Sequence, residues 1–282
     1  MNDAKKQNMT FWDHLDELRK VFFRACLVIV IFAGIAFFYK DILFDVVFAP
    51  HRSDFISYRL LCQLGEYLQM PSICPEDFHV ELINTQLAAQ FLTHLSVAVY
   101  AGILIASPYI IYLLFDFIKP ALYEKERKYS GRIIISAFIL FFSGVLLNYY
   151  VIFPLSFRFL GTYQVSEFVS NKIALSSYIS TFTMLSLMMG AVFEIPVLAF
   201  FFAKIGFIQA SWLKKYRRHA FLVILIVAAF ITPTADAFTL FLVAVPMYLL
   251  YELSIFVVKK STPKEKPAEE PSEEYENPYH YE

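Results

Sequence analysis

Residues 133–153 read IIISAFILFFSGVLLNYYVIF, a run of 21 residues without a charged side chain. About 20 helical residues cover the hydrocarbon core of a bilayer, which is about 30 Å thick. Lipid offers no hydrogen-bond partner to backbone N–H and C=O groups, so a segment of this kind must be helical. This stretch therefore predicts a membrane-spanning helix and sets the class of the whole fold.

Five further apolar runs lie on either side of this stretch. The predicted spans are Val21–Tyr39, Leu95–Phe115, Ile133–Phe153, Tyr178–Phe202, Ala220–Ile231 and Ala237–Val258. The fifth is short, because only 12 residues separate His219 from Thr232. At about 1.5 Å per residue it falls well below a full crossing, and local thinning of the membrane or a tilted hairpin is expected there.

The composition excludes a soluble domain, since 58% of the residues are hydrophobic and 17% are charged, against about 25% charged in soluble proteins. The tail from Ser261 holds two Lys and seven Glu, which leaves a body of net charge +4 within a chain of net charge −1. A weakly basic body fits a bilayer and not a nucleic acid. No metal-ligand spacing and no nucleotide-binding or hydrolase motif occurs, so no cofactor, no metal and no enzymatic activity are expected.

The basic residues are distributed unevenly between the two sides of the predicted spans. One side holds 19 of the 24 Lys and Arg, if the membrane-end Arg24 is included. The other side holds five, namely Lys40, Arg52, Arg59, Arg158 and Lys172. By the positive-inside rule both termini are cytoplasmic, which requires an even number of crossings. The sequence therefore predicts an all-α, multi-pass inner-membrane protein with six spans.

Three parts are predicted along the chain. Residues 1–20 are expected to form a cytoplasmic interfacial helix, capped by Thr10 and with Trp12 at headgroup depth. Residues 21–258 form the membrane domain, whose outer loop at residues 40–86 includes a predicted amphipathic surface helix at Ile56–Leu68. Residues 259–282 form an acidic tail rich in Pro and Glu, without apolar periodicity, which is expected to be disordered.

Glu194 lies deep in the fourth predicted span, with no basic residue within a helical turn. A carboxylate at mid-membrane costs on the order of 2.5–3.5 kcal/mol, so its side chain should face a cavity, a partner or water. Two interpretations stay open: a protonated glutamic acid bonded to a neighbouring helix, or a functional carboxylate. Pro196 removes a backbone hydrogen bond nearby, which predicts a kink in the same helix.

Five segments together resemble the signature sequences of the TatC family. They are His14-Leu-Asp-Glu-Leu-Arg19, Phe117-Ile-Lys-Pro-Ala-Leu-Tyr123 followed by Glu126-Arg127, Phe193-Glu-Ile-Pro196, Thr232-Pro233 with Asp236, and Pro246-Met-Tyr-Leu-Leu-Tyr-Glu252. They occur in the family's order and on the expected sides of the membrane. The resemblance implies a cupped six-helix receptor, with shortened fifth and sixth helices, that recognises the twin-arginine signal of a folded cargo protein.

The resemblance also assigns roles to individual residues. On composition alone, Glu17 and Glu126 belong to a solvated charged surface, but the resemblance implies that they engage the two arginines of the signal. A carboxylate can accept the planar guanidinium bidentately, which lysine cannot reproduce. The implied signal-peptide site further includes Leu15, Arg19, Phe117 and Tyr123. The positions implied for docking of the signal's apolar segment and of single-span TatA- and TatB-type subunits are Glu194, Pro196, Thr232 and Asp236.

This chain departs from the family pattern in two places. Some members carry a glutamine four residues after the hairpin aspartate, whereas this chain has Leu240, which removes that polar contact for a partner helix. The first outer loop is longer than usual and contains Cys62 and Cys74. Because this loop is predicted to lie outside the cytoplasm, where disulfides persist, we expect these two cysteines to be bridged, with Cys26 left as a free thiol in the first span.

The leading prediction is a non-catalytic receptor and core subunit of the twin-arginine translocase, working in an oligomeric complex and driven by the proton-motive force. The alternative is an ion-coupled secondary transporter that uses Glu194 as the titrating carrier. Such a transporter would normally need several intramembrane ionisable residues or broken helices. Spans one, three, five and six contain almost none, and no internal repeat is found.

Overall fold

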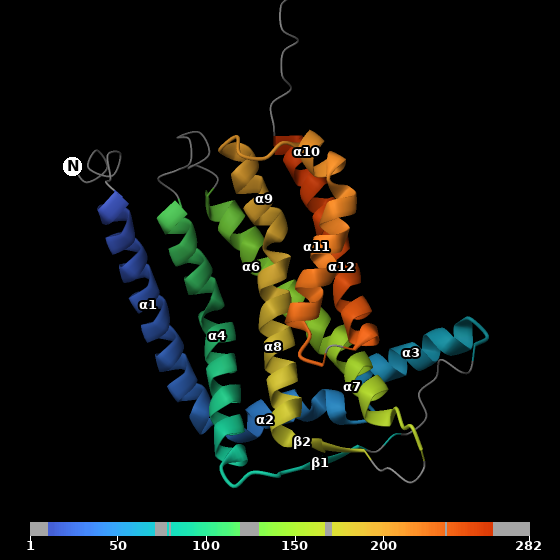
Figure 1. Cartoon of the computed structure of the whole chain (residues 1–282). Helices are drawn as coiled ribbons and strands as arrows, with labels where there is room; N and C mark the ends of the chain where they lie inside the picture. The colour runs from blue at the N-terminus through green and yellow to red at the C-terminus, as the bar shows by residue number, and fades with distance from the viewer. Residues whose placement is uncertain are drawn as a thin grey trace, which may run out of the picture.

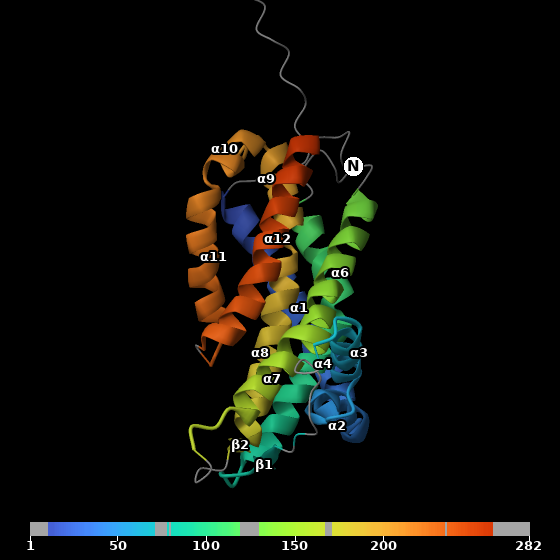
Figure 2. The same ribbon diagram turned by 90° about the vertical axis from the view of Figure 1, so that its right-hand side faces the viewer.

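The computed structural model describes residues 11–70, 78, 80–118, 130–166, 171–234 and 236–261. These residues form an elongated bundle of helices (Figures 1 and 2). The N-terminal end of α1 and the C-terminal end of α12 lie at the same end of the bundle. The distribution of Lys and Arg assigns this end to the cytoplasm, and we call it the cytoplasmic end and the opposite one the outer end.

Among the described residues, five helical segments are long and apolar enough to cross a membrane: Leu15–Phe38, Ala89–Phe117, Gly131–Thr162, Leu175–Lys204 and Ala237–Lys260. They are built from α1 (Phe11–Phe38), α4 (Ala89–Ile118), α6 (Ser130–Leu147) with the π-helical turn η5 (Asn148–Ile152) and α7 (Phe153–Thr162), α8 (Leu175–Phe193) with α9 (Ile195–Lys204), and α12 (Ala237–Ser261). Together with the shorter α11 (Arg217–Ile231) they confirm the six predicted spans.

α11 is the short span that the sequence predicts. Its 15 residues give a length of about 22 Å, less than the hydrocarbon thickness of about 30 Å. The resemblance implies a short α12 as well, but α12 has 25 residues, so this expectation is wrong for its length. The hairpin between α11 and α12 nevertheless ends well before the outer ends of α4 and α8, because α11 is too short to reach them (Figures 1 and 2).

The N-terminal segment differs from its prediction. α1 runs without interruption from Phe11 to Phe38, so the separate helix expected up to Lys20 is instead the first part of the first span. The physical reason is that no proline or glycine separates the two parts, and the residues between them are good helix formers. The side chain of Trp12 is 76% exposed, and its place at headgroup depth stays a prediction. Thr10 lies outside the described residues.

Small residues set the closest contacts between neighbouring spans. A Cβ atom added to Gly102 of α4 would lie 2.7 Å from the backbone nitrogen of Ala33 in α1. A Cβ atom added to Gly144 of α6 would lie 2.5 Å from the carbonyl oxygen of Met189 in α8. These glycines let the backbones approach, which matters in a bilayer because lipid provides no hydrophobic force between helices.

The outer surface of the bundle is apolar, as a bilayer requires. Only 11% of the apolar window of the first span is buried. Phe22, Leu27, Val30 and Ile31 on α1 are each more than half exposed. A surface of this kind on a soluble protein would be an aggregation hazard, whereas in lipid it is the contact surface with acyl chains.

The outer end is covered by short elements from the first outer loop. They are α2 (Lys40–Phe48), η2 (Ala49–His51), α3 (Ile56–Tyr67) and the strand β1 (Glu81–Ile83). α3 confirms the predicted surface helix. β1 pairs in parallel with β2 (Lys172–Ala174), with Glu81 opposite Lys172 and their side chains 3.2 Å apart. The sequence does not predict this sheet, because three-residue strands are too short to show an alternating pattern.

The largest buried cluster lies where the third and fourth spans meet the outer loop. Phe153 packs edge-on against Tyr178 and Phe182, with ring centroids 5.1 and 5.0 Å away. The hydroxyl of Tyr178 donates a hydrogen bond to the carbonyl of Val47 in α2 at 2.8 Å. The outer loop is thus fastened to the spans both by aromatic packing and by a buried hydrogen bond.

Two of the three cysteines lie in the described part of the chain. Cys62 on α3 takes part in a disulfide, and Cys26 in α1 is a free thiol, as predicted. Cys74 lies outside the described residues, so its pairing with Cys62 stays a prediction.

We expect alkylation of the unfolded protein without reductant to block one thiol per chain, that of Cys26. Intact-mass measurement before and after reduction checks this, since reduction should expose two more thiols. Closing this small loop should stabilise the local fold by roughly 3 kcal/mol in the chain-entropy model. Three blocked thiols without reductant would contradict the bridge.

Candidate functional site

The first group of candidate residues lies on α1 at the cytoplasmic end. Leu15 is exposed and Glu17 is half-buried. Arg19 forms an ion pair with Asp16 at 3.4 Å, with both side chains more than 60% exposed. A surface pair of this kind adds little to stability, but it occupies Asp16. Among the described residues, none donates a hydrogen bond to the carboxylate of Glu17 or forms an ion pair with it.

The second group lies in the connection between α4 and α6. Phe117 is half-buried at the end of α4. Tyr123 and Glu126 lie outside the described residues. The end of α4 and the beginning of α6, which flank them, lie at the cytoplasmic end, as the start of α1 does (Figure 1). Of the two motifs, the structure thus places Leu15, Glu17 and Arg19 at the same end of the bundle as Phe117.

Glu194 occupies a break in the fourth span. α8 ends at Phe193 and α9 begins at Ile195, because Pro196 has no N–H to continue the helical ladder. The helix restarts directly, since the N–H groups of Val197 and Leu198 both donate to the carbonyl of Glu194, at 3.0 and 2.9 Å. The kink that Pro196 predicts therefore takes the form of a break between α8 and α9, and the carboxyl group of Glu194 lies at this break.

The carboxyl group of Glu194 lacks a partner within the described chain. Its Oε1 atom is buried and accepts no hydrogen bond. An unsatisfied buried polar group costs about 1–3 kcal/mol. Of the two interpretations that the sequence leaves open, the described residues do not provide the bond to a neighbouring helix that the first one needs.

The hairpin at the outer ends of α11 and α12 uses its polar residues locally. The buried hydroxyl of Thr232 donates to the carbonyl of Ala228 at 3.0 Å. The carboxylate of Asp236 accepts the backbone N–H of Thr239 at 2.7 Å and the hydroxyl of Thr234 at 2.6 Å. Burial alone would raise the pKa of Asp236, but these hydrogen bonds outweigh it and hold the pKa below its ordinary value. Asp236 therefore acts as the N-cap of α12.

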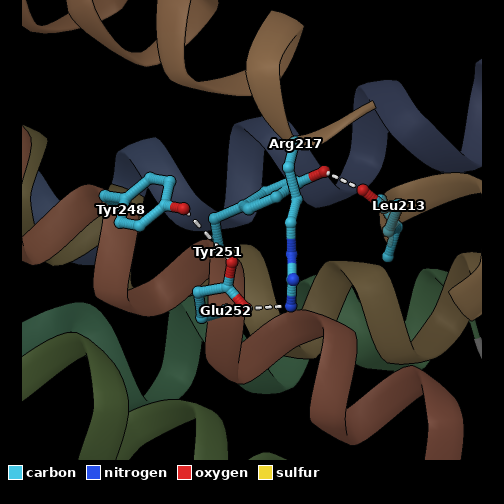
Figure 3. Close-up of polar contacts among 5 residues, drawn as sticks. All are labelled: Leu213, Arg217, Tyr248, Tyr251 and Glu252. Carbon is cyan, nitrogen blue, oxygen red and sulfur yellow. Dashed lines mark hydrogen bonds and ion pairs between the residues drawn. The ribbon is translucent and has the colours of Figure 1, made fainter. Parts of the chain in front are cut away.

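A further polar cluster, which the sequence analysis did not identify as a unit, joins the two helices at the cytoplasmic end (Figure 3). Arg217 at the start of α11 donates to the carboxylate of Glu252 in α12, with Nη2 and Oε2 2.7 Å apart. The hydroxyl of Tyr248 donates to the other oxygen of Glu252 at 3.3 Å. The hydroxyl of Tyr251 donates to the carbonyl of Leu213 at 2.7 Å, in α10 (Ala210–Lys215). These contacts hold the connection between α9 and α11 against α12.

One signal in the sequence pointed to half of this cluster. Tyr248 and Glu252 stand four residues apart, so they share one face of a helix, and both lie in the last signature segment. Arg217 comes from a basic cluster that serves equally to set the orientation in the membrane. Nothing in the sequence singles it out as the partner of Glu252, because the pairing depends on the angle of the hairpin.

The fold and these sites define a class: a six-span helical membrane protein with charged candidate sites at its cytoplasmic end and one carboxyl group at a helix break in the fourth span. Residues 13–246 match the family described as Sec-independent protein translocase protein (TatC). The chain belongs to the TatC family, as the five signature segments predict, and is thus a component of a membrane protein translocase.

Relatives of known identity agree with this assignment. The TatC protein of Blattabacterium sp. subsp. Periplaneta americana is 38% identical over 256 residues, which cover 90% of this chain and 96% of the relative. The TatC protein of Campylobacter jejuni is 34% identical, over 90% and 95% of the two chains. A crystal structure described as the twin arginine translocase receptor TatC superposes with a TM-score of 0.69 at 28% identity, over 88% of this chain and 99% of the other.

We expect Arg217→Lys to loosen the α11–α12 connection, because an ammonium group cannot reproduce the directed guanidinium contact with Glu252. The pair is partly exposed, so the loss should be about 0.5–1 kcal/mol. Hydrogen exchange of the backbone amides of residues 210–220 should accelerate by a factor of about 2–5. Arg218→Lys, one residue further on, is the matched control and should leave this rate unchanged. Equal exchange in both variants would contradict a role for the pair.

Proposed function

We propose that the chain is the signal-peptide receptor subunit of the twin-arginine translocase in the bacterial inner membrane. The observation that carries the proposal is the carboxylate of Glu17 on α1, to which no described residue donates. It lies at the same end of the bundle as the end of α4 and the beginning of α6, between which Glu126 stands in the sequence. Family membership supports the translocase role, and the position of Glu17 supports the specific ligand.

The chemistry of the ligand follows from the two carboxylates. Two adjacent arginines present two planar forks of N–H donors, and each fork matches one carboxylate in a bidentate geometry. Leu15 and Phe117 offer apolar surface beside the charges, and Tyr123 belongs to the same proposed site. Arg19 contributes indirectly, since it occupies Asp16 and so leaves Glu17 as the accessible acid.

The proposed role of the fourth span is docking. The unsatisfied Oε1 of Glu194 would gain a hydrogen bond from a polar group of a single-span TatA- or TatB-type subunit or of the signal peptide. Pro196 maintains the break between α8 and α9, because it has no N–H group to continue the helical hydrogen bonds. In this proposal Thr232 and Asp236 act by fixing the turn of the outer hairpin, so that α11 and α12 present a constant surface to partners. The subunit is non-catalytic and works in an oligomeric complex that draws on the proton-motive force.

A second candidate function is an ion-coupled transporter with Glu194 as the carrier. The observation in its favour is that a buried carboxyl group stands at a helix break, as ion sites of such transporters often do. The two functions differ in what they require of this residue. A carrier must titrate, whereas a docking point needs only a polar group that can hydrogen bond.

We expect Glu17→Ala and Glu126→Ala each to weaken the binding of a twin-arginine signal peptide about tenfold or more. The reason is that a charged hydrogen bond is worth about 1.5–3 kcal/mol. Binding of the twin-lysine variant of the peptide should change much less. Affinity is measured with both peptides on the purified full chain.

Asp16→Ala serves as the control for this test, because it removes an acid one residue away that is already paired with Arg19. It should leave the preference for arginine intact. Equal losses for the twin-arginine and twin-lysine peptides in the Glu17 and Glu126 variants would refute the recognition role.

For Glu194 we expect Glu194→Gln to keep expression, thermal stability and protein export nearly intact, since an amide preserves the polar contact. Glu194→Leu should disturb partner assembly or export, because it removes that contact. The measurements are co-purification of the single-span subunits and transport of a twin-arginine cargo. Normal transport by Glu194→Leu membranes would exclude docking, and loss of transport in both Glu194→Gln and Glu194→Leu would favour the carrier.

A further inference from the structure

An apolar groove lies between α3 and the third span at the outer end. It has a volume of about 450 Å³. α3 points away from the bundle near the outer ends of the spans (Figure 1). The groove therefore lies in the angle between α3, which runs along the membrane, and the third span, which crosses it. The lining residues are Ile56, Ser57, Leu60, Leu61 and Leu64 of α3 with Tyr150, Val151 and Leu155 of the third span.

The two walls of the groove are fixed to each other. The hydroxyl of Ser57 donates to the carbonyl of Tyr150, which belongs to the π-helical turn η5. The ring of Phe55 stacks on that of Tyr150, with centroids 5.8 Å apart and planes within 9°. The buried hydroxyl of Tyr58 is shared between the carbonyls of Pro50 and Pro154, each 3.0 Å away. Burial raises the pKa of Tyr58, so its hydroxyl stays protonated and remains a donor.

The chemistry of the lining restricts the ligand. Apart from the hydroxyl of Tyr150, the only polar side chain among the eight is that of Ser57, and its hydroxyl is already donated to a backbone carbonyl. The remaining walls are branched aliphatic side chains. A ligand with polar or charged groups would lose its hydration here without compensation, so the groove suits a hydrocarbon.

The position of the groove in the membrane decides which hydrocarbon can reach it. Its inner wall belongs to Gly131–Thr162, which is a membrane span. An exposed apolar stripe on this span continues into the groove, formed by Ile135, Ile139, Phe142, Leu146, Tyr150 and Val151. The groove is therefore open to the bilayer and continuous with a lipid-facing surface. On the other wall, which α3 forms, the side chains of Leu60 and Leu64 are 53% and 55% exposed. Each therefore has apolar surface that a ligand could cover.

We propose that this groove binds an acyl chain of a phospholipid from the outer leaflet. The chain would lie along the third span beneath the apolar face of α3, while the headgroup remains at the interface beside that helix. A transmembrane helix of a partner fits less well, because it would have to continue through the outer interface where α3 lies across its path. An acyl chain needs no such exit. The bound lipid would support α3 and with it the outer loop.

The test uses the full chain in vesicles of phosphatidylethanolamine and phosphatidylglycerol that contain a trace of phosphatidylglycerol with a diazirine in one acyl chain. After illumination, adducts are mapped by mass spectrometry of peptides. We expect adducts at residues 56–64 and 150–155 to exceed those at the equally exposed Ile135 and Ile139 about fivefold. Adducts spread evenly along the lipid-facing stripe would overturn the proposal. So would groove adducts that vanish when single-span subunits are added, since they would assign the groove to a partner helix.

A matched pair of double variants provides a second measurement. Leu60→Gln with Leu64→Gln changes the groove, and Ile135→Gln with Ile139→Gln places the same change at the same spacing on the open stripe. Phospholipid retained by the purified protein is counted by mass spectrometry after detergent removal. The groove variant should retain about tenfold less than the wild type, and the control variant should match the wild type. Equal retention in the two variants would contradict the proposal, and the labelling of the wild-type chain decides the question if the groove variant fails to fold.

Discussion

The satisfaction of backbone hydrogen bonds in lipid is the constraint on which the rest of this structure depends. Where the helical ladder is complete, side chains can be apolar and face acyl chains. Where it is interrupted, another group must supply the missing bond or the site remains unsatisfied. The π-helical turn at Asn148–Ile152 meets this need with Ser57, which donates to the carbonyl of Tyr150. The interruption at Pro196 differs, because there the helix restarts on the carbonyl of Glu194 while one carboxyl oxygen is left buried and unpaired.

The short α11 creates a second requirement. A helix of 15 residues that lies at the edge of the bundle buries few side chains, so packing alone fixes its angle weakly. Polar contacts compensate at both ends of the hairpin. Asp236 caps α12 at the outer turn, and Arg217 binds Glu252 at the cytoplasmic end. Both contacts are of ordinary strength, and each acts where a small rotation would otherwise move the whole hairpin.

The sequence predicts the spans well because each is an apolar run with charged or polar ends, and this signal is local. It also predicts the short α11, the surface helix α3 and the free thiol of Cys26. It misplaces the start of the first span, because a charged amphipathic turn and an apolar run can share one continuous helix. The short sixth helix, which the family resemblance implies, is not found, since α12 has 25 residues. The β1–β2 pair and the Arg217–Glu252 contact could not be predicted, since each joins residues far apart in the chain whose proximity depends on how the helices pack.

The acidic residues at the cytoplasmic end show how the arrangement of charges can select a ligand. Asp16 is paired with Arg19 and Glu252 with Arg217, so an incoming cation would have to displace an existing guanidinium to reach either of them. No described residue is paired with Glu17 in this way, and its half-buried position strengthens a charged contact relative to a fully exposed one. A guanidinium on the ligand gains little from competing with another guanidinium, but it gains a full bidentate contact at a vacant carboxylate. In the proposed receptor, selectivity for arginine at this end rests as much on the pairs that occupy the neighbouring acids as on the carboxylate of Glu17.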